Sequence, residues 1–251
     1  YGPKGFHEGV NVPLGAEPAS GVGEVIATVR RQLWGGADFI KIYADYRWTP
    51  GAPSQPTFLP EELEAMVNAA KSAGKYAVAH DSTPEGMKRD ILAGVETIEH
   101  GDAATQDTYK LMKANKTVLY PTLSAGDAIE RYNGWDGKTD TDRIRRKKES
   151  FTLALASGVT IGFGGDVGVY PHGENYRELE LMVAYGMSES TVLKAATDIN
   201  ARTFHLGNLG QVREGYLADL IAVPGDPTKD IQAMRVVSFV MLNGKVVKKD
   251  F

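Results

Sequence analysis

The chain has 251 residues, and 28 Lys and Arg against 32 Asp and Glu leave a formal net charge of −4. That balance argues against nucleic acid or an anionic membrane as a partner, because either selects a basic face. The sequence contains no cysteine, which excludes disulfides, thiolate metal sites and a cysteine nucleophile. No segment is apolar enough to span a bilayer and no signal-peptide pattern opens the chain, so we expect a soluble protein of undetermined compartment.

From residue 24 to about 206, short apolar segments alternate with amphipathic ones. The apolar segments predict strands at Asp38–Tyr43, Lys75–His80, Val95–His100, Thr117–Thr122 and Thr160–Asp166. The amphipathic segments predict helices at Glu24–Trp34, Leu59–Gly74, Pro84–Ala93, Thr105–Ala114, Asp140–Ser157, Tyr176–Tyr185 and Ser188–Leu206. Short strands joined by crossover helices run parallel, so we expect an α/β domain with a parallel sheet.

Residues 207–251 have a different pattern. Three short β segments are predicted, at Leu217–Val223, Val236–Leu242 and Lys245–Lys248. The Asn243-Gly244 pair between the last two is a strong hairpin signal. So small a β segment cannot stand alone. We therefore predict two parts, residues 1–206 and a C-terminal β segment of residues 207–251 that packs on another sheet or surface.

Four ionisable residues lie in or at the ends of predicted strands, and enzymes with parallel sheets place their sites at the carboxyl ends. Lys41 lies inside an apolar strand, and His80 and His100 each end one. Asp166 ends a glycine-rich strand. Each alone has an ordinary explanation: a structural histidine, an aspartate in a turn, or a lysine paired with a neighbouring carboxylate. Together they favour one site, which requires the strand ends to converge.

At this point the sequence resembles the amidohydrolase superfamily, in its imidazolonepropionase-like and Xaa-Pro dipeptidase-like branch. The resemblance covers roughly residues 20–251 and depends on an ordered set of motifs, each weak alone. They are Gly36–Lys41, Ala79–His80 with Glu85–Gly86, Ala93–Gly101, Gly164–Gly168 with Pro171–Gly173, Ala195–Thr197, Ala218–Leu220 and Gly225–Pro227.

The resemblance implies a hydrolase of amide, peptide-like or cyclic amide C–N bonds, with one or two zinc-type ions at the mouth of a (β/α)8 TIM barrel. Lys41 would be carboxylated and bridge two metals. His80 and His100 would bind the second metal, and Asp166 would contact the first metal and act as proton shuttle. A hydroxide held by the metal would attack, and the acid would move its proton to the leaving amine.

The sequence departs from this family in one respect. The first metal is normally anchored by a His-x-His motif, but the five histidines stand at positions 7, 80, 100, 172 and 205. His7 lies in a Gly/Pro-rich loop and cannot fill that role alone. The five predicted strands match the fourth to eighth of a barrel, followed by part of a small β-sandwich. We therefore expect Tyr1 to follow the third barrel strand, and an N-terminal segment of the same gene product to complete the site.

Weaker signals surround these residues. Gly162 and Gly164 share a face with Asp166 and would leave room for metal and substrate. The basic run Arg143–Lys148 is expected on a solvated helix face. Three further residues are predicted to contact substrate: Tyr43, Tyr120 and His172.

Other functions stay open. The missing His-x-His motivates an alternative in which the chain is a non-catalytic fragment or binding subunit. A barrel isomerase or phosphate-ester enzyme without metal ranks lower, because no glycine-rich phosphate loop is recognisable. The partners expected for the leading function are a small amide or peptide-like substrate and further copies of the chain in a homo-oligomer.

Overall fold

A computed structural model of the chain describes residues 16–251. His7, for which no ligand role was expected, lies outside the described residues. The chain forms two compact units. The first unit contains the residues up to Leu119 together with Ser157–Thr160, and the second contains Tyr120–Ala156 and Ile161–Phe251. The predicted division at residue 206 lies inside the second unit and stays a prediction.

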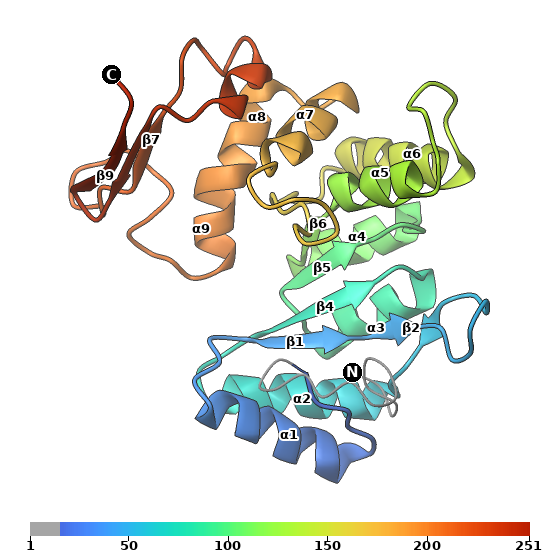
Figure 1. The fold of residues 1–251 in the computed structure, drawn as a ribbon. Coiled ribbons are helices and arrows are strands. Elements are labelled where there is room, and N and C mark those ends of the chain that lie inside the picture. The colour runs from blue at the N-terminus through green and yellow to red at the C-terminus, as the bar shows by residue number, and fades with distance from the viewer. Residues whose placement is uncertain (1–15) are drawn as a thin grey trace. The chain divides into compact units, whose positions relative to one another are not determined.

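A parallel sheet organises the first unit, in the order β1-β4-β5-β6 (Figure 1). Its strands are β1 (Ile40–Tyr43), β4 (Ala77–Asp81), β5 (Thr97–His100) and β6 (Val118–Tyr120), whose last residue begins the second unit. These are four of the five predicted strands. The fifth, Thr160–Asp166, is reduced to a single bridge residue, Ile161. The α/β fold with a parallel sheet is confirmed. No closed barrel forms within residues 16–251, and the partial barrel stays a prediction.

Helices pack beside this sheet in chain order. They are α1 (Val22–Trp34), α2 (Pro60–Ser72), α3 (Pro84–Ala93) and α4 (Gln106–Asn115), each contacting the next. Local chemistry sets their ends: Thr83 caps α3 by accepting a hydrogen bond from the Gly86 N–H, and Gly94 ends α3 in a left-handed conformation. A short hairpin, β2 (Asp45–Tyr46) with β3 (Gln55–Pro56), was not predicted.

The second unit is mainly helical. Its helices are α5 (Leu123–Tyr132), α6 (Asp142–Ser157), α7 (Tyr176–Ala184), α8 (Glu189–Lys194), the π-helical turn η1 (Ala195–Ile199), α9 (Asn200–Thr203) and the 3₁₀ helix η2 (Ile231–Arg235). The segment from α8 to α9 is the last helix predicted from sequence. Helix α5 was missed because its first turn has no cap of its own. Glu178 of α7 supplies that cap by accepting from the N–H groups of Leu123 and Ser124, at 2.9 and 2.6 Å.

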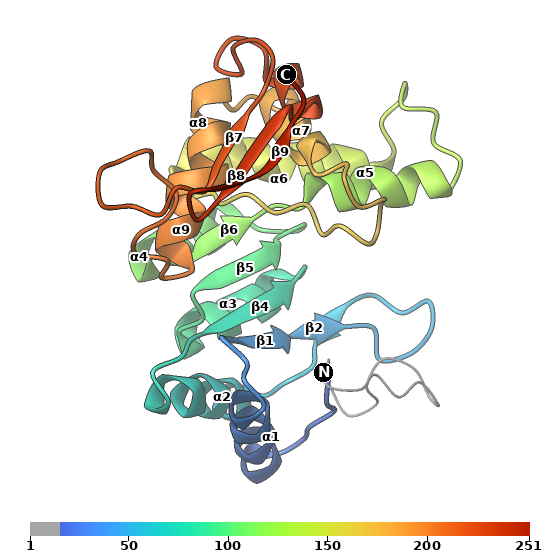
Figure 2. The same ribbon diagram turned by 60° about the vertical axis from the view of Figure 1, so that its left-hand side comes forward.

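The C-terminal strands form an antiparallel sheet, β7 (Leu220–Ala222), β8 (Phe239–Leu242) and β9 (Lys245–Lys249) (Figure 2). Asn243 and Gly244 both have positive φ, of 47° and 76°, which confirms the predicted hairpin turn. The sandwich arrangement of this sheet stays a prediction.

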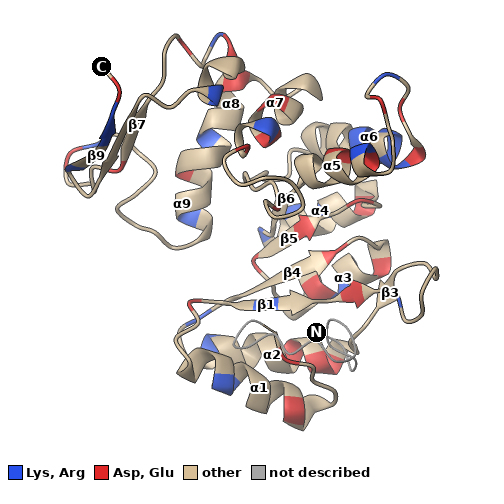
Figure 3. Cartoon of the chain, in the orientation of Figure 1, with Lys and Arg blue, Asp and Glu red and all other residues tan. Residues whose placement is uncertain are grey.

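Charges of both signs are mixed on α6 and the loop before it (Figure 3). Most of the basic run there is solvated as predicted, and its cations pair with nearby acids, as Lys148 does with Asp140. Lys147 is the exception, because it is buried and donates to the carbonyl oxygen of Pro121 at 2.6 Å. None of the helices in residues 16–251 has the length and apolar character to cross a membrane.

Candidate metal centre

Two of the predicted ligands, His80 and His100, meet at the carboxyl ends of β4 and β5. The strands are in register, with His80 opposite Glu99 and Asp81 opposite His100. The two imidazole rings contact each other with their centroids 4.3 Å apart and their planes at 68°. Neutral imidazole nitrogens are the ligands that zinc prefers in catalytic sites without cysteine. The first unit therefore brings together two side chains of the right chemistry.

An unusual backbone at His100 makes this contact possible. Neighbouring residues of a strand point to opposite faces of the sheet. His80 is the register partner of Glu99, so both point to the same face. In a regular strand, His100 would therefore point to the other face, away from His80. His100 instead has a φ of 78°, in the left-handed region, and Gly101 follows with 60°. A Cβ at Gly101 would lie 2.8 Å from Leu119, so only glycine fits there. Conformations of this kind cost energy and cluster at functional sites.

Lys41 forms an ion pair with Glu99, two strands away across β4. The second oxygen of the Glu99 carboxylate accepts from the hydroxyl of Thr97, which is fully buried. The ordinary explanation considered for Lys41, pairing with a neighbouring carboxylate, is therefore what the structure shows. Glu99 is part of a quoted motif, but no role was predicted for it. Its position in a short strand directly before His100 could have indicated a residue near the site.

Three of the other predicted site residues, Tyr120, Asp166 and His172, belong to the second unit. Asp166 is exposed and has a φ of 60°, the same left-handed backbone as His100. His172 is exposed in the loop that follows. Tyr43 belongs to the first unit and stacks on the His80 ring, with centroids 3.9 Å apart and an interplanar angle of 18°. The structure thus gathers Tyr43, His80 and His100, while convergence with Asp166 stays a prediction.

The space expected beside Gly162 and Gly164 is not open. A Cβ on Gly162 would lie 2.4 Å from the ring of Tyr120, and one on Gly164 would lie 3.2 Å from it. The expectation of room for metal there was wrong, because the buried Tyr120 ring fills it. The Tyr120 hydroxyl donates to Oδ1 of Asn200 at 3.0 Å. Asn200, which directly follows the π-helical turn, was missed from sequence.

Three buried carboxyl groups belong to the same unit as the histidines: Asp45, Asp81 and Asp90 are each fully buried. Asp45 Oδ2 accepts from the backbone N–H groups of Ser82 and Thr83, at 2.8 and 2.6 Å. Asp81 and Asp90 are close enough for the charge of one to act on the other, and none of their four oxygens has a hydrogen-bond partner among the described residues. None of the three was predicted from sequence.

Burial is the main cause that shifts the pKa values of these acids. Burial raises the pKa of Asp90 to about 7, and burial together with the charge of Asp90 raises the pKa of Asp81 well above its usual range. Burial also raises the pKa of Asp45, against the opposing effect of its backbone hydrogen bonds. Burial and the nearness of two carboxyl groups therefore favour the protonated form in this pair.

The metal implied by the sequence can be tested against this donor set. His80 and His100 fit two ligand positions of a zinc site by chemistry and by mutual distance. No group of three His, Asp or Glu side chains arranged to hold a metal occurs within residues 16–251. The described residues therefore supply part of such a site.

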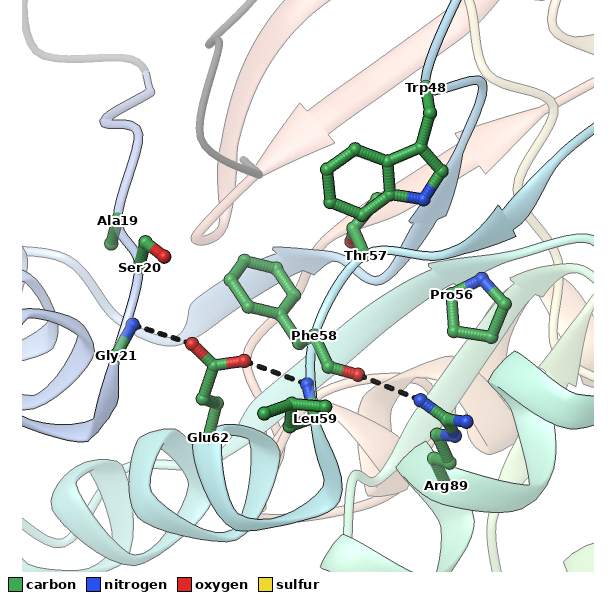
Figure 4. A pocket seen from close by; sticks show the side chains of 10 residues that line it. All are labelled: Ala19, Ser20, Gly21, Trp48, Pro56, Thr57, Phe58, Leu59, Glu62 and Arg89. Carbon is green, nitrogen blue, oxygen red and sulfur yellow. Dashed lines mark hydrogen bonds between the residues drawn. The ribbon is translucent and has the colours of Figure 1, made fainter. Parts of the chain in front are cut away.

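A pocket of about 380 Å³ lies elsewhere in the first unit (Figure 4). It is lined by Ala19, Ser20, Gly21, Trp48, Pro56, Thr57, Phe58, Leu59, Glu62 and Arg89. Its polar groups are engaged: Glu62 accepts from the N–H groups of Gly21 and Leu59, and Arg89 donates to the carbonyl of Phe58. Thr57 joins its wall to the end of β1 by donating to the Tyr43 carbonyl at 2.9 Å. None of the predicted ligands lines this pocket.

Comparison with known proteins decides the family. The sequence pattern of the Amidohydrolase family matches residues 4–247. The chain belongs to the Amidohydrolase family. Ochratoxinase from Aspergillus niger is 33% identical over 246 residues, covering 92% of this chain and 50% of that protein.

Solved structures agree with this amidohydrolase assignment. A Xaa-Pro dipeptidase with methionine bound in its active site has a TM-score of 0.82 and 35% identity, over 96% of this chain and 63% of that one. A prolidase complexed with N-methylphosphonate-L-proline has a TM-score of 0.78 and 28% identity, over 93% and 60%. The chain spans about half the length of the ochratoxinase that it matches.

Proposed function

We propose that this amidohydrolase cleaves amide or peptide-like C–N bonds with the help of a divalent metal, and that His80 and His100 hold part of that metal. The observation that carries the proposal is the contact of the two imidazoles at 4.3 Å, made possible by the left-handed backbone of His100. An ochratoxinase and a Xaa-Pro dipeptidase among similar proteins favour amide substrates. A dipeptidase activity is the narrower form of the proposal.

Each residue has a defined part in this chemistry. When bound, a zinc-type ion lowers the pKa of water so that a nucleophile exists at neutral pH. His80 and His100 would each offer one neutral nitrogen to it. Lys41 would leave Glu99 and lose a proton to become a neutral amine. Its Nζ would then add to CO2 with loss of a second proton, and the resulting carbamate could serve as a bridging ligand. Asp166 would accept a proton from the attacking water and pass it to the leaving amine.

Substrate contacts are proposed at the rim of this site. Tyr43 stacks on His80, so its ring lies next to one proposed ligand. His172 is exposed six residues after Asp166 and could donate to a substrate carboxylate. Tyr120 is buried with its hydroxyl on Asn200, so any contribution to the pocket would come from the ring face. Assembly into a homo-oligomer stays part of the proposal.

The test combines metal content with product release. The protein containing this chain is purified with zinc and assayed for the amine released from an N-acyl amino acid and an Xaa-Pro dipeptide. We expect chelation to abolish activity, zinc to restore it, and His80→Ala and His100→Ala to lower both zinc content and activity at least ~100-fold, the size of effect expected for ligands and their supports. The control is His205→Ala, at the end of α9, which should retain both. Full activity in a metal-free double variant would refute the proposal.

A second candidate is a non-catalytic binding subunit whose site needs a His-x-His supplied by another segment. It is favoured by the finding that the part of the chain described by the structure gathers no three metal-binding side chains. Intact mass and metal content distinguish the two candidates. A co-purifying segment that carries His-x-His, together with bound zinc, supports the enzyme, whereas a lone chain with no partner segment and no metal supports the second candidate.

A further inference from the structure

The buried carboxylate of Asp45 is held by the two residues that follow β4, the strand that contains His80. Asp45 begins β2 just after β1, and its side chain is fully buried. Its Oδ2 atom accepts from the backbone N–H groups of Ser82 and Thr83, which directly follow β4. These two donors belong to the loop that begins α3, where the helix dipole favours negative charge. The orientation of the carboxylate is therefore fixed by backbone groups.

The second oxygen of this carboxylate is directed at the imidazole of His80. Asp45 Oδ1 is buried, receives no hydrogen bond from the described residues, and lies 4.0 Å from Nε2 of His80. The ring is held from its face by Tyr43, which stacks on it at 3.9 Å. Nε2 of His80 thus lies near an acceptor that receives no hydrogen bond from the described residues.

We propose that Asp45 is a positioning residue that keeps the proton of neutral His80 on Nε2 and so leaves the lone pair on Nδ1 for a metal. This inference depends on the proposed function for its purpose. A histidine ligand usually donates its second N–H to a carboxylate or carbonyl, which fixes the tautomer and the ring orientation. The separation exceeds a hydrogen bond by about 1 Å. A tilt of the ring would bring Nε2 within hydrogen-bond distance of Asp45 Oδ1.

The two backbone donors make Asp45→Asn an unusually sharp test. An asparagine at this position must turn its amide oxygen toward the N–H groups of Ser82 and Thr83, because its NH2 group cannot accept from them. The NH2 group then replaces Oδ1 and faces His80. A donor at that place requires a lone pair on Nε2, so the proton moves to Nδ1 and the ligand nitrogen is lost. A nearly isosteric change therefore reverses the tautomer.

The experiment uses ¹⁵N-histidine-labelled chain, free of metal, in a long-range ¹H–¹⁵N spectrum recorded where His80 is neutral. His80→Ala identifies the His80 signals. We expect the Nε2–H form in the parent chain and the Nδ1–H form in Asp45→Asn, with zinc affinity lowered about 10- to 100-fold. The matched control is Glu62→Gln, which also alters a buried carboxylate that accepts from two backbone N–H groups in the same unit. It should change neither the tautomer nor the affinity.

Several results would overturn the inference. The inference is wrong if His80 carries its proton on Nδ1 in the parent chain. This result needs no variant, so the test remains valid if Asp45→Asn does not fold. The inference is also wrong if a folded Asp45→Asn keeps both the tautomer and the zinc affinity of the parent chain. A parent chain with the Nε2–H form that binds no zinc would refute the proposed function and leave the role of Asp45 toward the His80 proton standing.

Discussion

Buried carboxyl groups occur in both units, and Glu178 of the second unit contrasts with the Asp81–Asp90 pair of the first. Glu178 accepts from two backbone N–H groups, and Lys147 lies close enough to lower its pKa. None of the four oxygens of Asp81 and Asp90 has a hydrogen-bond partner among the described residues. Burial raises the pKa of all three residues, but the hydrogen bonds to Glu178 oppose that shift. Glu178 is thus stabilised by donors that the aspartate pair lacks.

This difference distinguishes a carboxylate with a structural role from carboxyl groups whose burial is unfavourable for stability. Glu178 caps the start of α5, so its burial is accounted for by the fold. The aspartate pair accepts no hydrogen bond from a helix end, and Asp81 directly follows His80 in sequence. Natural proteins retain unsatisfied or strained groups chiefly near functional sites. The left-handed backbone of His100 belongs to the same region of the first unit.

The largest effect is expected from Glu178→Ala. The change leaves two buried N–H groups without their acceptor and removes the negative charge that acts on the buried Lys147, so the free energy of unfolding should fall by about 3–5 kcal/mol. Urea unfolding monitored by circular dichroism measures it. Glu174→Ala is the control, because Glu174 forms an exposed ion pair with Arg177 and should cost at most about 1 kcal/mol. Equal losses in both variants would show that the buried hydrogen bonds of Glu178 contribute no more than an exposed ion pair.

Asp90→Asn should produce a pH-dependent gain. The native pKa of Asp90, about 7, exceeds its ordinary value, so the folded chain binds more protons than the unfolded chain. Stability from this group is present at low pH and is lost as pH rises through 7. Asparagine does not titrate, so the stability difference from the parent should widen by about 2 kcal/mol between pH 5 and 8.

Thermal unfolding across that pH range checks the prediction for Asp90. The control is Asp107→Asn, because Asp107 is exposed on α4 and pairs only with Lys110 among the described residues. A constant difference between Asp90→Asn and the parent chain at all pH values would show that the aspartate pair does not retain a proton.

Gly86→Ala should have the smallest of the three effects. A Cβ at this position would lie 2.4 Å from Asp81 Oδ1 and 3.2 Å from Asp45 Oδ2, so the carboxylates must move. We expect a loss of about 1–2 kcal/mol and weaker zinc binding. Gly23→Ala is a matched control, because Gly23 is also near the start of a helix and a Cβ there meets nothing within 4 Å. That variant should gain up to about 1 kcal/mol.

The sequence was informative wherever structure depends on neighbouring residues. The helix Pro84–Ala93 was predicted with its observed bounds, because Thr83, Pro84 and Gly94 are local start and stop signals. The Asn243-Gly244 hairpin was predicted for the same reason. His80 and His100 were identified as candidate ligands from their places at strand ends, and the structure brings their rings into contact.

Features that depend on distant residues were not predictable. Helix α5 is capped by Glu178, which is 55 residues from Leu123, so nothing in its own sequence marks its start. The Tyr120 ring fills the space beside Gly162 because the fold brings position 162 next to position 120, which residue spacing within one strand cannot show. The role assigned to Asp45 likewise comes from the pairing of β1 with β4 and not from any motif.

The most direct test of the proposed metal site is a zinc titration of the chain followed on its imidazole signals. We predict that the signals of His80 and His100 shift together and saturate at the same zinc concentration, while the signal of His205 is unchanged. Zinc binding that leaves the signals of both His80 and His100 in place would contradict the proposed site.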